Sequence, residues 1–451
     1  MKSISLVLFV CSALLFTACG GGGGQTSSTP AVTVEVVKSP VPDYPDARIL
    51  DAFLQPAGTF FVKGMDGANR AFFFPTLYFN EPLLPGIEFI ETSPDVYEIA
   101  NVLDNVQLGN ARDYSLMDEN QSEYKRFVLV DHGLELATGY ETWPFGDVWV
   151  ATDYGSGFVF EGITQHKGFY HSVDAYDIDG NGYDEIMALN MGMHGGDFQY
   201  DSIHSFDDSI GNYIQYNAFS AEDIVGAGGA VRFVDLNNDG VKELVQALYR
   251  YNDSFSEFEI FNWGAIRVWE LNPDGLYSVV HTTPREGLWG ASPSLGCARI
   301  VPIDINNDGL QDLLFNMEGS EEYGIELYVN EGNFELTRVT ADALNVYKWT
   351  FLEFGVVNIE SADINNDGFD DIVFDGYFGY ESEVDLARLF FINKQENKFE
   401  QYNNVASLRF NFSTSNEKPQ FLRWMSTTDG VTKFFGYDSL GSPVVVNLEF
   451  P

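Results

Sequence analysis

The 451-residue chain is poor in cysteine and in positive charge. It has three cysteines, and Cys11 and Cys19 lie within and directly after an apolar N-terminal leader, so Cys297 has no disulfide partner in the mature chain. Lysine and arginine total 24 against 67 aspartates and glutamates, which gives a formal net charge of −43. This excess of negative charge argues against partners such as nucleic acid and against charge-driven binding to anionic lipid.

The sequence also lacks the short motifs of common enzymes. It contains no GxSxG elbow, no P-loop and no HExxH, so hydrolase, nucleotide-binding and metalloprotease functions find no support. Five of the six histidines fall within one stretch, but their spacing matches no known ligand motif; they are His132, His166, His171, His194 and His204. No catalytic residue can be assigned, because 67 acidic residues make chance carboxylate pairs inevitable.

A nine-residue pattern, Asp-x-Asn-x-Asp-Gly-x-x-Asp, occurs four times in close variants. Oxygen-bearing side chains stand at positions 1, 3, 5 and 9, and glycine stands at position 6, where a tight loop turns back on itself. Calcium takes about six to eight oxygen ligands, including main-chain carbonyls such as that of position 7. The pattern therefore predicts about four Ca²⁺ sites, with these ligands: Asp177, Asp179, Asn181, Tyr183 and Glu185; Asp235, Asn237, Asp239, Val241 and Glu243; Asp304, Asn306, Asp308, Leu310 and Asp312; Asp363, Asn365, Asp367, Phe369 and Asp371.

An EF-hand and a plain turn both fit the pattern less well. An EF-hand needs a bidentate Glu at position 12 and flanking helices. Position 12 instead holds Ala188, Gln246, Phe315 and Phe374, and the flanking segments are branched and aromatic, which is typical of strands. A plain Asn-Asp-Gly turn would bind nothing, but no turn requires the acid at position 9.

The four patterns begin at residues 177, 235, 304 and 363, so they recur about every 60 residues. Such a period indicates a repeat architecture, and a four-stranded propeller blade fits the length. Asp66-Gly67 and Asp429-Gly430 are interpreted as weakened copies, expected to be metal-free because Arg70 and Lys433 stand at their ninth place. One further unit at 113–132 completes an all-β propeller of seven four-stranded blades, in which a segment from the opposite terminus completes the last blade.

The N-terminus predicts export and anchoring. Residues 1–18 form a signal peptide with an apolar run, and residues 16–19, Phe-Thr-Ala-Cys, resemble the bacterial lipobox. This resemblance implies lipidation of Cys19, a flexible tether over residues 19–45 and the propeller over 46–451. The protein would then be an outer-membrane lipoprotein of the bacterial cell envelope, periplasmic or surface-exposed, that contacts the membrane only through its lipid. The alternative is an ordinary cleaved signal and a secreted protein.

The repeated loops resemble those of the FG-GAP and VCBS-type repeat family. The resemblance is specific over about residues 165–400 and implies propeller hairpins that hold calcium. The Gly-Ala-Pro element of the family is missing, with 188–190 (Ala-Leu-Asn) and 374–376 (Phe-Asp-Gly) in its place. The chain is therefore closer to the bacterial VCBS-like branch, and integrin-type partner binding is not implied.

Together these features predict a monomeric, calcium-braced propeller that acts as a binding or adhesion module for a glycan or protein. An aromatic-rich stretch between the second and third loops packs in the core or forms a binding surface; it contains Tyr249, Tyr251, Phe255, Phe258, Phe261, Trp263 and Trp269. A polysaccharide-degrading lyase or glycosidase is the alternative function, and a subunit of an envelope assembly machine is a third.

Overall fold

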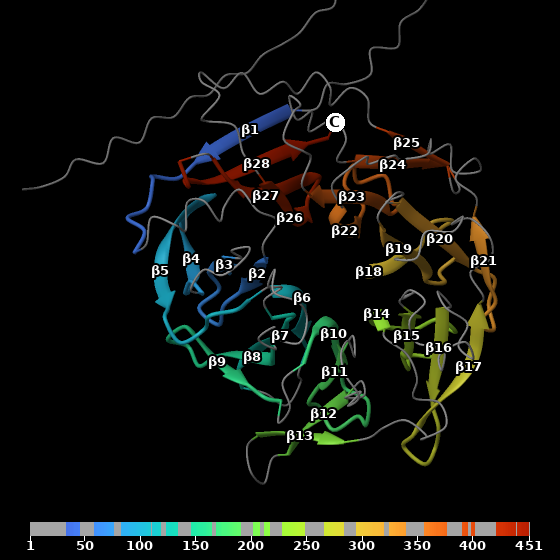
Figure 1. The fold of residues 1–451 in the computed structure, drawn as a ribbon. Coiled ribbons are helices and arrows are strands. Elements are labelled where there is room, and N and C mark those ends of the chain that lie inside the picture. The colour runs from blue at the N-terminus through green and yellow to red at the C-terminus, as the bar shows by residue number, and fades with distance from the viewer. Residues whose placement is uncertain are drawn as a thin grey trace, which may run out of the picture.

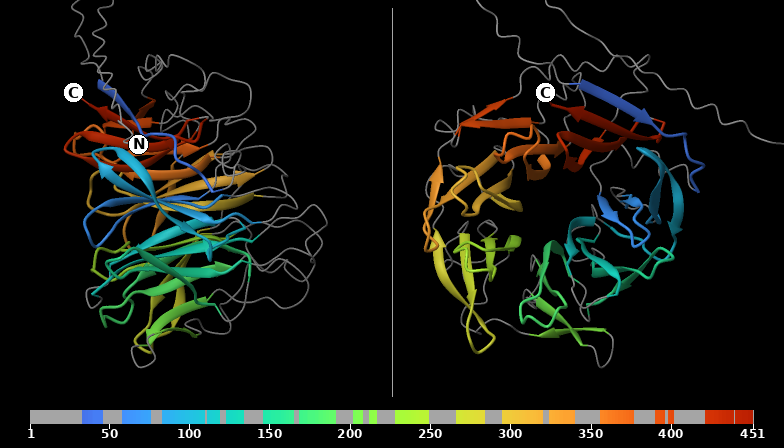
Figure 2. Two further views of the ribbon diagram at one scale, coloured as in Figure 1. Left: turned by 90° about the vertical axis from the view of Figure 1, so that its left-hand side faces the viewer. Right: turned by 180° about the vertical axis from the view of Figure 1, so that it is seen from behind.

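The fold consists of β-strands around a central axis. The computed structural model describes residues 33–45, 58–75, 83–109, 111–118, 123–133, 146–164, 168–190, 202–207, 212–216, 228–248, 266–283, 295–319, 324–339, 356–376, 390–395, 398–401, 421–438 and 440–450. These ranges contain no helix, and hence none long and apolar enough to cross a membrane. Their strands form seven four-stranded antiparallel sheets arranged like propeller blades (Figures 1 and 2). The prediction of an all-β chain of four-stranded sheets is confirmed.

Six sheets follow the order of the chain. Sheet 1 contains β2 (Thr59–Lys63), β3 (Asn69–Phe73), β4 (Gly86–Ser93) and β5 (Val96–Leu103); sheet 2 contains β6 (Ala111–Met117), β7 (Lys125–Asp131), β8 (Val148–Asp153) and β9 (Phe158–Gly162); sheet 3 contains β10 (Tyr170–Tyr176), β11 (Glu185–Asn190), β12 (Ser202–Asp207) and β13 (Asn212–Tyr216). Sheet 4 contains β14 (Gly228–Val234), β15 (Glu243–Leu248), β16 (Ile266–Leu271) and β17 (Tyr277–Thr283); sheet 5 contains β18 (Leu295–Ile303), β19 (Asp312–Gly319), β20 (Gly324–Asn330) and β21 (Leu336–Val339); sheet 6 contains β22 (Val356–Ala362), β23 (Asp371–Gly376), β24 (Phe390–Gln395) and β25 (Lys398–Gln401).

Sheet 7 joins the two ends of the described chain. Its strand order is β1-β28-β27-β26, with β1 (Thr33–Lys38), β26 (Phe421–Thr428), β27 (Val431–Tyr437) and β28 (Pro443–Glu449). Val36 of β1 lies opposite Val446 of β28. The tether predicted over residues 19–45 therefore contains a strand of the folded unit, and the predicted boundary at residue 46 is wrong. Residues 1–32, which include the predicted signal peptide and Cys19, lie outside the described residues.

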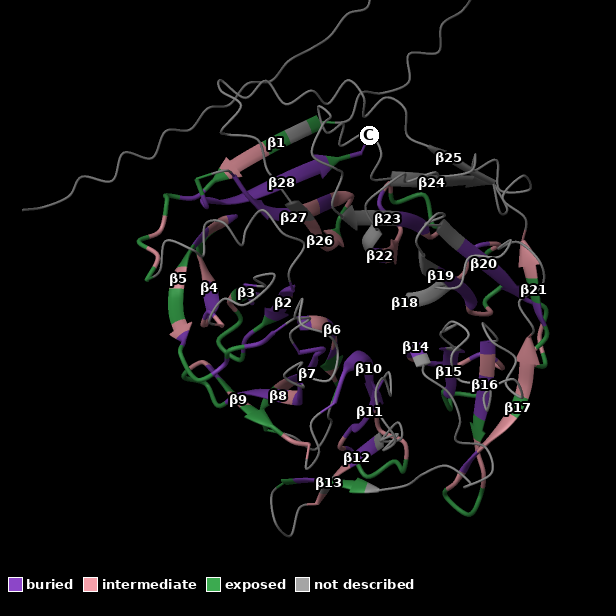
Figure 3. Cartoon of the chain, in the orientation of Figure 1, coloured by how far each residue is buried: buried purple, intermediate pink, exposed green. Residues whose placement is uncertain are grey.

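Apolar side chains fill the space between neighbouring sheets, because each sheet has an apolar face to bury on either side. Phe72 of β3 packs against Phe127 of β7 and Phe158 of β9, with ring centroids 5.3 and 5.2 Å apart. Sheets 4 and 5 share a cluster that includes Val245 and Phe315. Burial is highest on strands such as β11 and β28, whereas the outermost strands β5 and β9 carry many exposed residues (Figure 3). Large aromatic side chains, such as Phe72, Phe127 and Phe315, are thus among the most buried of the described residues.

Polar contacts connect the first strands of sheets 2, 3 and 4. The Asp113 carboxylate accepts hydrogen bonds from Ser172 Oγ (2.8 Å) and Val173 N (3.2 Å) of the next sheet. One sheet further, Asp174 accepts bonds from Phe233 N (2.7 Å) and Arg232 Nη1 (3.2 Å). Ser115 Oγ also donates to Asp174, and Ser172 Oγ donates to the carbonyl of Val231. Residue numbers therefore increase together along each pair of strands, and β6, β10 and β14 run in the same direction along the axis. The turns that follow these strands therefore share one face of the ring.

We predict that β1 protects an otherwise open sheet edge. A chain that begins at residue 40 leaves β28 without its outer partner, so it unfolds at a lower temperature and self-associates through the exposed edge. Thermal melting and light scattering should show both effects relative to a chain that begins at residue 33. Equal melting temperatures for the two chains would contradict this role of β1.

Candidate metal centres

The four nine-residue patterns form loops between the first and second strands of sheets 3, 4, 5 and 6. In each, the last residue of the first strand lies opposite position 9: Tyr176 opposite Glu185, Val234 opposite Glu243, Ile303 opposite Asp312, and Ala362 opposite Asp371. The predicted strand-loop-strand context is confirmed. The flanking strands also exclude an EF-hand, which requires helices.

Two residues in each loop adopt positive φ. The glycine at position 6 does so in all four loops, as its place in a tight turn predicts: Gly182 (φ 90°), Gly240 (88°), Gly309 (87°) and Gly368 (90°). Position 4 does the same, which was not predicted from the sequence: Gly180 (73°), Asn238 (59°), Asn307 (56°) and Asn366 (58°). The signal was present, because glycine and asparagine are the residues that adopt this conformation most readily.

Main-chain hydrogen bonds hold the carboxylates at positions 1 and 9 in the same way in every loop. The N–H of position 6 donates to the carboxylate of position 1, at 2.8 Å for Gly182 to Asp177, 3.0 Å for Gly240 to Asp235, 3.0 Å for Gly309 to Asp304 and 2.8 Å for Gly368 to Asp363. The N–H of position 2 donates to the carboxylate of position 9, at 2.7 Å for Ile178 to Glu185, 2.8 Å for Leu236 to Glu243, 3.0 Å for Ile305 to Asp312 and 3.0 Å for Ile364 to Asp371. Each loop therefore holds two carboxylate groups in place through hydrogen bonds from its own backbone.

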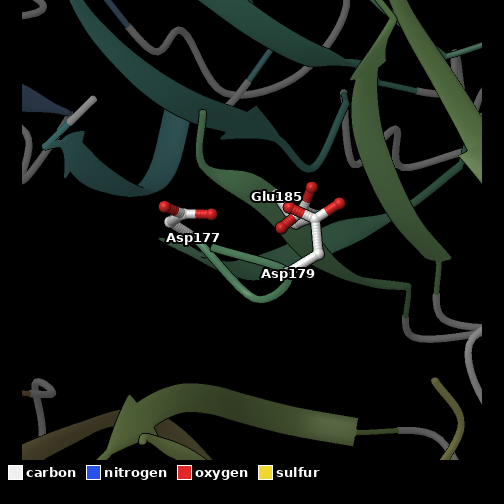
Figure 4. A group of neighbouring side chains, drawn as sticks. All are labelled: Asp177, Asp179 and Glu185. Atoms are coloured by element: carbon white, nitrogen blue, oxygen red, sulfur yellow. The ribbon is translucent and has the colours of Figure 1, made fainter. Parts of the chain in front are cut away.

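The loop of sheet 3 gathers three acidic side chains. One carboxylate oxygen from each of Asp177, Asp179 and Glu185 lies within 4.8 Å of the others (Figure 4). Asp177 Oδ1 is buried and has no hydrogen-bond partner. Oxygen atoms of like charge so close together repel one another, and a hard divalent cation between them would remove the repulsion and supply the missing partner. The donor set therefore fits such a cation.

In the other three loops the asparagine at position 3 lies among the acidic groups. Its Nδ2 donates to the position 5 carboxylate, at 3.0 Å for Asn237 to Asp239, 2.8 Å for Asn306 to Asp308 and 3.0 Å for Asn365 to Asp367. In the loop of sheet 4 the same nitrogen also donates to Glu243 (3.0 Å), so there the amide lies between two carboxylates. Rotation of this amide would present its oxygen instead, which is the ligand atom that calcium requires.

Burial perturbs the acids at position 9. It raises the pKa of Glu185 and of Glu243 to about 7, and that of Asp312 to about 6. Hydrogen bonds from main-chain N–H groups act in the opposite direction, while the acidic side chains at other positions of the same loops raise these pKa values further. A bound cation would favour the charged form, so protons and cations compete for these groups.

The register of the other hairpins shows which of them are equivalent to these loops. Met117 lies opposite Arg126, so β6 and β7 enclose a loop of the same length, with Asp118 at position 1 and Arg126 at position 9. The nine-residue pattern does not identify this loop, part of which lies outside the described residues. A guanidinium at position 9 places positive charge where the other loops have a carboxylate.

The two hairpins interpreted as weakened copies are shorter turns, so that alignment is wrong. Lys63 lies opposite Asn69, and Thr428 lies opposite Val431, which leaves too few residues for a nine-residue loop. Asp-Gly supplies ordinary turn chemistry here, with positive φ at Gly67, Asp429 and Gly430. The basic residues placed at the ninth position form ion pairs instead, Arg70 with Asp66 (2.7 Å) and Glu88 (3.0 Å), and Lys433 with Asp95 (2.6 Å).

His132, His171 and His204 are buried, whereas His281 of β17 is half-buried, with Nε2 2.8 Å from Thr283 Oγ1. The rings of His132 and His171 lie 4.4 Å apart, and both are buried. Burial lowers the pKa of both residues well below the ordinary value and lowers that of His204 to about 4, so all three are neutral at pH 7. Within the described ranges they join no cluster of metal-ligating groups. His166 and His194 lie outside these ranges.

Of the aromatic residues of the stretch 249–269, the structure describes only Trp269. Trp269 lies in β16 with 3% of its surface exposed and packs between sheets 3 and 4. Core packing is therefore the correct account for this residue. Tyr249, Tyr251, Phe255, Phe258, Phe261 and Trp263 lie outside the described residues.

The calcium-free protein should lose stability as the pH rises. Because Glu185 has a pKa near 7 in the folded chain and about 4.5 in the unfolded chain, the folded state binds more protons between these values. Its contribution to the free energy of unfolding is therefore largest below pH 4.5 and declines as the pH rises through 7.

Urea denaturation in EDTA at pH 5 and pH 8 measures this effect. Glu185→Gln, which stays neutral, should reduce the pH dependence, whereas Glu161→Gln at an exposed position of β9 should not. An identical pH dependence in the wild type and Glu185→Gln would contradict the assignment.

Comparison with known proteins identifies a family match and similar solved structures. Residues 304–374 match the FG-GAP-like repeat family, which confirms the resemblance over the loops of sheets 5 and 6. No sequence among the curated proteins matches the chain. A solved lectin from Agrocybe aegerita, described as recognising non-reducing terminal N-acetylglucosamine, is 12% identical with a TM-score of 0.44, covering 81% of this chain and 86% of the lectin. At that TM-score the similarity carries no inference about function.

Proposed function

We propose that this chain, which carries an FG-GAP-like repeat, is a calcium-braced, seven-bladed β-propeller that serves as a binding module at a bacterial cell envelope. The observation that carries the proposal is the common framework of the four loops in sheets 3 to 6. Each loop fixes its first and ninth carboxylates with the same two main-chain hydrogen bonds. Turn formation alone does not need a buried acid at position 9.

In the proposed sites, calcium binds to oxygen atoms that the loops already bring together. In the loop of sheet 3 these are the side chains of Asp177, Asp179, Asn181 and Glu185 and the carbonyl of Tyr183. Equivalent residues serve in the other three loops. Calcium supplies only charge neutralisation and cross-linking of the loop, and its role is structural. Arg126 makes the equivalent loop of sheet 2 unsuitable for a cation.

Ring closure is part of the same proposal. The seven sheets act as blades, and β1 closes the ring because it pairs with β28 while Ser39 Oγ accepts a hydrogen bond from Tyr97 N of sheet 1 (2.8 Å). Contacts between sheets 7 and 1 also include the ring pair Phe61 and Phe435, 5.4 Å apart. These contacts complete the circle of face-to-face packing that a propeller needs.

The binding surface is proposed on the face opposite the calcium loops. The loops follow the first strand of each sheet, so the connections from second to third strands leave from the other face. Strands β11, β15 and β23 run toward that face, and the sequence between each of them and the next described strand is 191–201, 249–265 and 377–389. The stretch 249–265 is rich in aromatic residues, which suit stacking on sugar rings or contact with a protein. Attachment through Cys19 would hold this module at the envelope.

Calcium should stabilise the protein. A site filled at about 100 times its dissociation constant adds about 2.7 kcal/mol to the free energy of unfolding. Calorimetric melting should therefore show a higher melting temperature in millimolar Ca²⁺ than in EDTA. Asp235→Asn, which keeps the acceptor for Gly240 N but loses the charge, should reduce this shift. Asp274→Asn, in the exposed hairpin between β16 and β17, should leave it unchanged. A melting temperature that EDTA does not alter would refute calcium bracing.

The binding role needs a separate experiment. A glycan array probed with the calcium-loaded protein should show retention of specific glycans without conversion. The same glycans are then assayed for new reducing ends or unsaturated products. Product formation would favour the alternative function, a lyase or glycosidase. If no glycan is retained, the glycan ligand is refuted, and co-purification from envelope extracts then tests for a protein ligand.

A further inference from the structure

In three of the four proposed calcium loops the residue at position 8 lies against the preceding sheet, at the start of its loop or at the strand end before it. Asp184 Oδ2 accepts a hydrogen bond from Asp118 N (2.8 Å), and Asp370 Oδ2 accepts one from Asp304 N (3.0 Å). Lys242 Nζ lies 5.0 Å from the ring centroid of Tyr176, the residue that precedes Asp177. In these three loops position 8 therefore contacts the preceding sheet, while position 9 is bonded within its own loop.

Between sheets 4 and 5 the connection is indirect. Asn330, at the end of β20, donates from Nδ2 to the carbonyl of Gln311 (3.1 Å), which is position 8 of the sheet 5 loop. The same nitrogen donates to the carbonyl of Leu236 (2.7 Å), which is position 2 of the sheet 4 loop. The loops on this face thus form a continuous series of contacts from sheet 2 to sheet 6.

The contact between sheets 5 and 6 is the most direct link between two proposed sites. Asp304 is a ligand of one site, and its own N–H bonds to Asp370. Asp370 lies between Phe369 and Asp371, which are both ligands of the other site. No intermediate side chain separates the two loops. In sheets 2 and 3 the equivalent bond from Asp118 to Asp184 leads to the loop with Arg126, where no second cation is expected.

We propose that Asp370 couples calcium binding in the loops 304–312 and 363–371, so that occupancy of either site strengthens binding at the other. This inference rests on the proposed calcium sites. A cation in the loop 363–371 fixes residues 369 and 371 and thereby Asp370, which in turn holds Asp304 in the position needed for its own cation. The second site then loses less conformational freedom on binding, which gives positive coupling. Asp370 is a positioning residue and not itself a ligand.

Hydrogen exchange measured by mass spectrometry during a Ca²⁺ titration tests the coupling at each loop separately. Peptides that cover 304–312 and 363–371 report the calcium midpoint of each site. Asp363→Asn, which keeps the acceptor for Gly368 N, should raise the midpoint of the loop 304–312 by about fivefold or more, the lower end of common coupling factors. Asp304→Asn should raise the midpoint of the loop 363–371 by the same factor, because coupling is reciprocal.

Asp370→Ala identifies the residue responsible. In this background, Asp363→Asn should no longer shift the midpoint of the loop 304–312. Asp370→Asn, which retains an acceptor oxygen, should keep the coupling and serves as the test if the alanine variant does not fold. Gln311→Ala is the matched control at position 8 of sheet 5, and it should leave the coupling intact.

The outcomes separate the coupling from the calcium sites themselves. Equal midpoints of the loop 304–312 in the wild type and Asp363→Asn would overturn the coupling while calcium binding stands. Coupling that persists in Asp370→Ala would overturn the role of this residue. If calcium protects none of the four loops, the proposed calcium sites fail, and the coupling fails with them.

Discussion

Repulsion between closely held carboxylates is the constraint on which this structure depends. The chain carries a net charge of −43, and it concentrates part of that charge in small loops on one face of the ring. Main-chain hydrogen bonds hold the carboxylates at positions 1 and 9 in place, so these groups cannot move apart without breaking the loop. At neutral pH the loops can relieve the repulsion by protonation, by an intervening amide or by a cation. A calcium ion is the one of these that also binds the other oxygen atoms of the loop.

The sheets provide the rigid frame for these loops. Face-to-face apolar packing, as between Phe72 and Phe127, fixes the sheets relative to one another, and polar contacts such as Asp174 with Arg232 fix their first strands. Because the first strands run in one direction, the loops that follow them lie on the same face and contact their neighbours. The N–H of Asp304, for example, donates to Asp370 of the next loop.

Prediction from sequence succeeded where the information is local. The turn at Gly368 and the strands on either side of each nine-residue loop lie within about a dozen residues, so the pattern alone identifies them. Prediction failed where the same residues, Asp-Gly, occur in two different kinds of turn. Asp66-Gly67 and Asp429-Gly430 have the turn residues of the nine-residue loops, but only the strand register shows that they are short hairpins. The loop that ends at Arg126 was missed for the opposite reason, since it has the right length without the pattern.

The sequence by itself determined the β-class, the period of the repeat and the pattern of oxygen-bearing side chains in each loop, because these depend on residues that are neighbours in the chain. Only the tertiary structure decided that β1 pairs with β28, that Trp269 is buried and that Asp370 contacts Asp304. Such contacts join residues far apart in the chain. Their partners are chosen by the circular packing of the sheets, and no short segment of sequence contains that information.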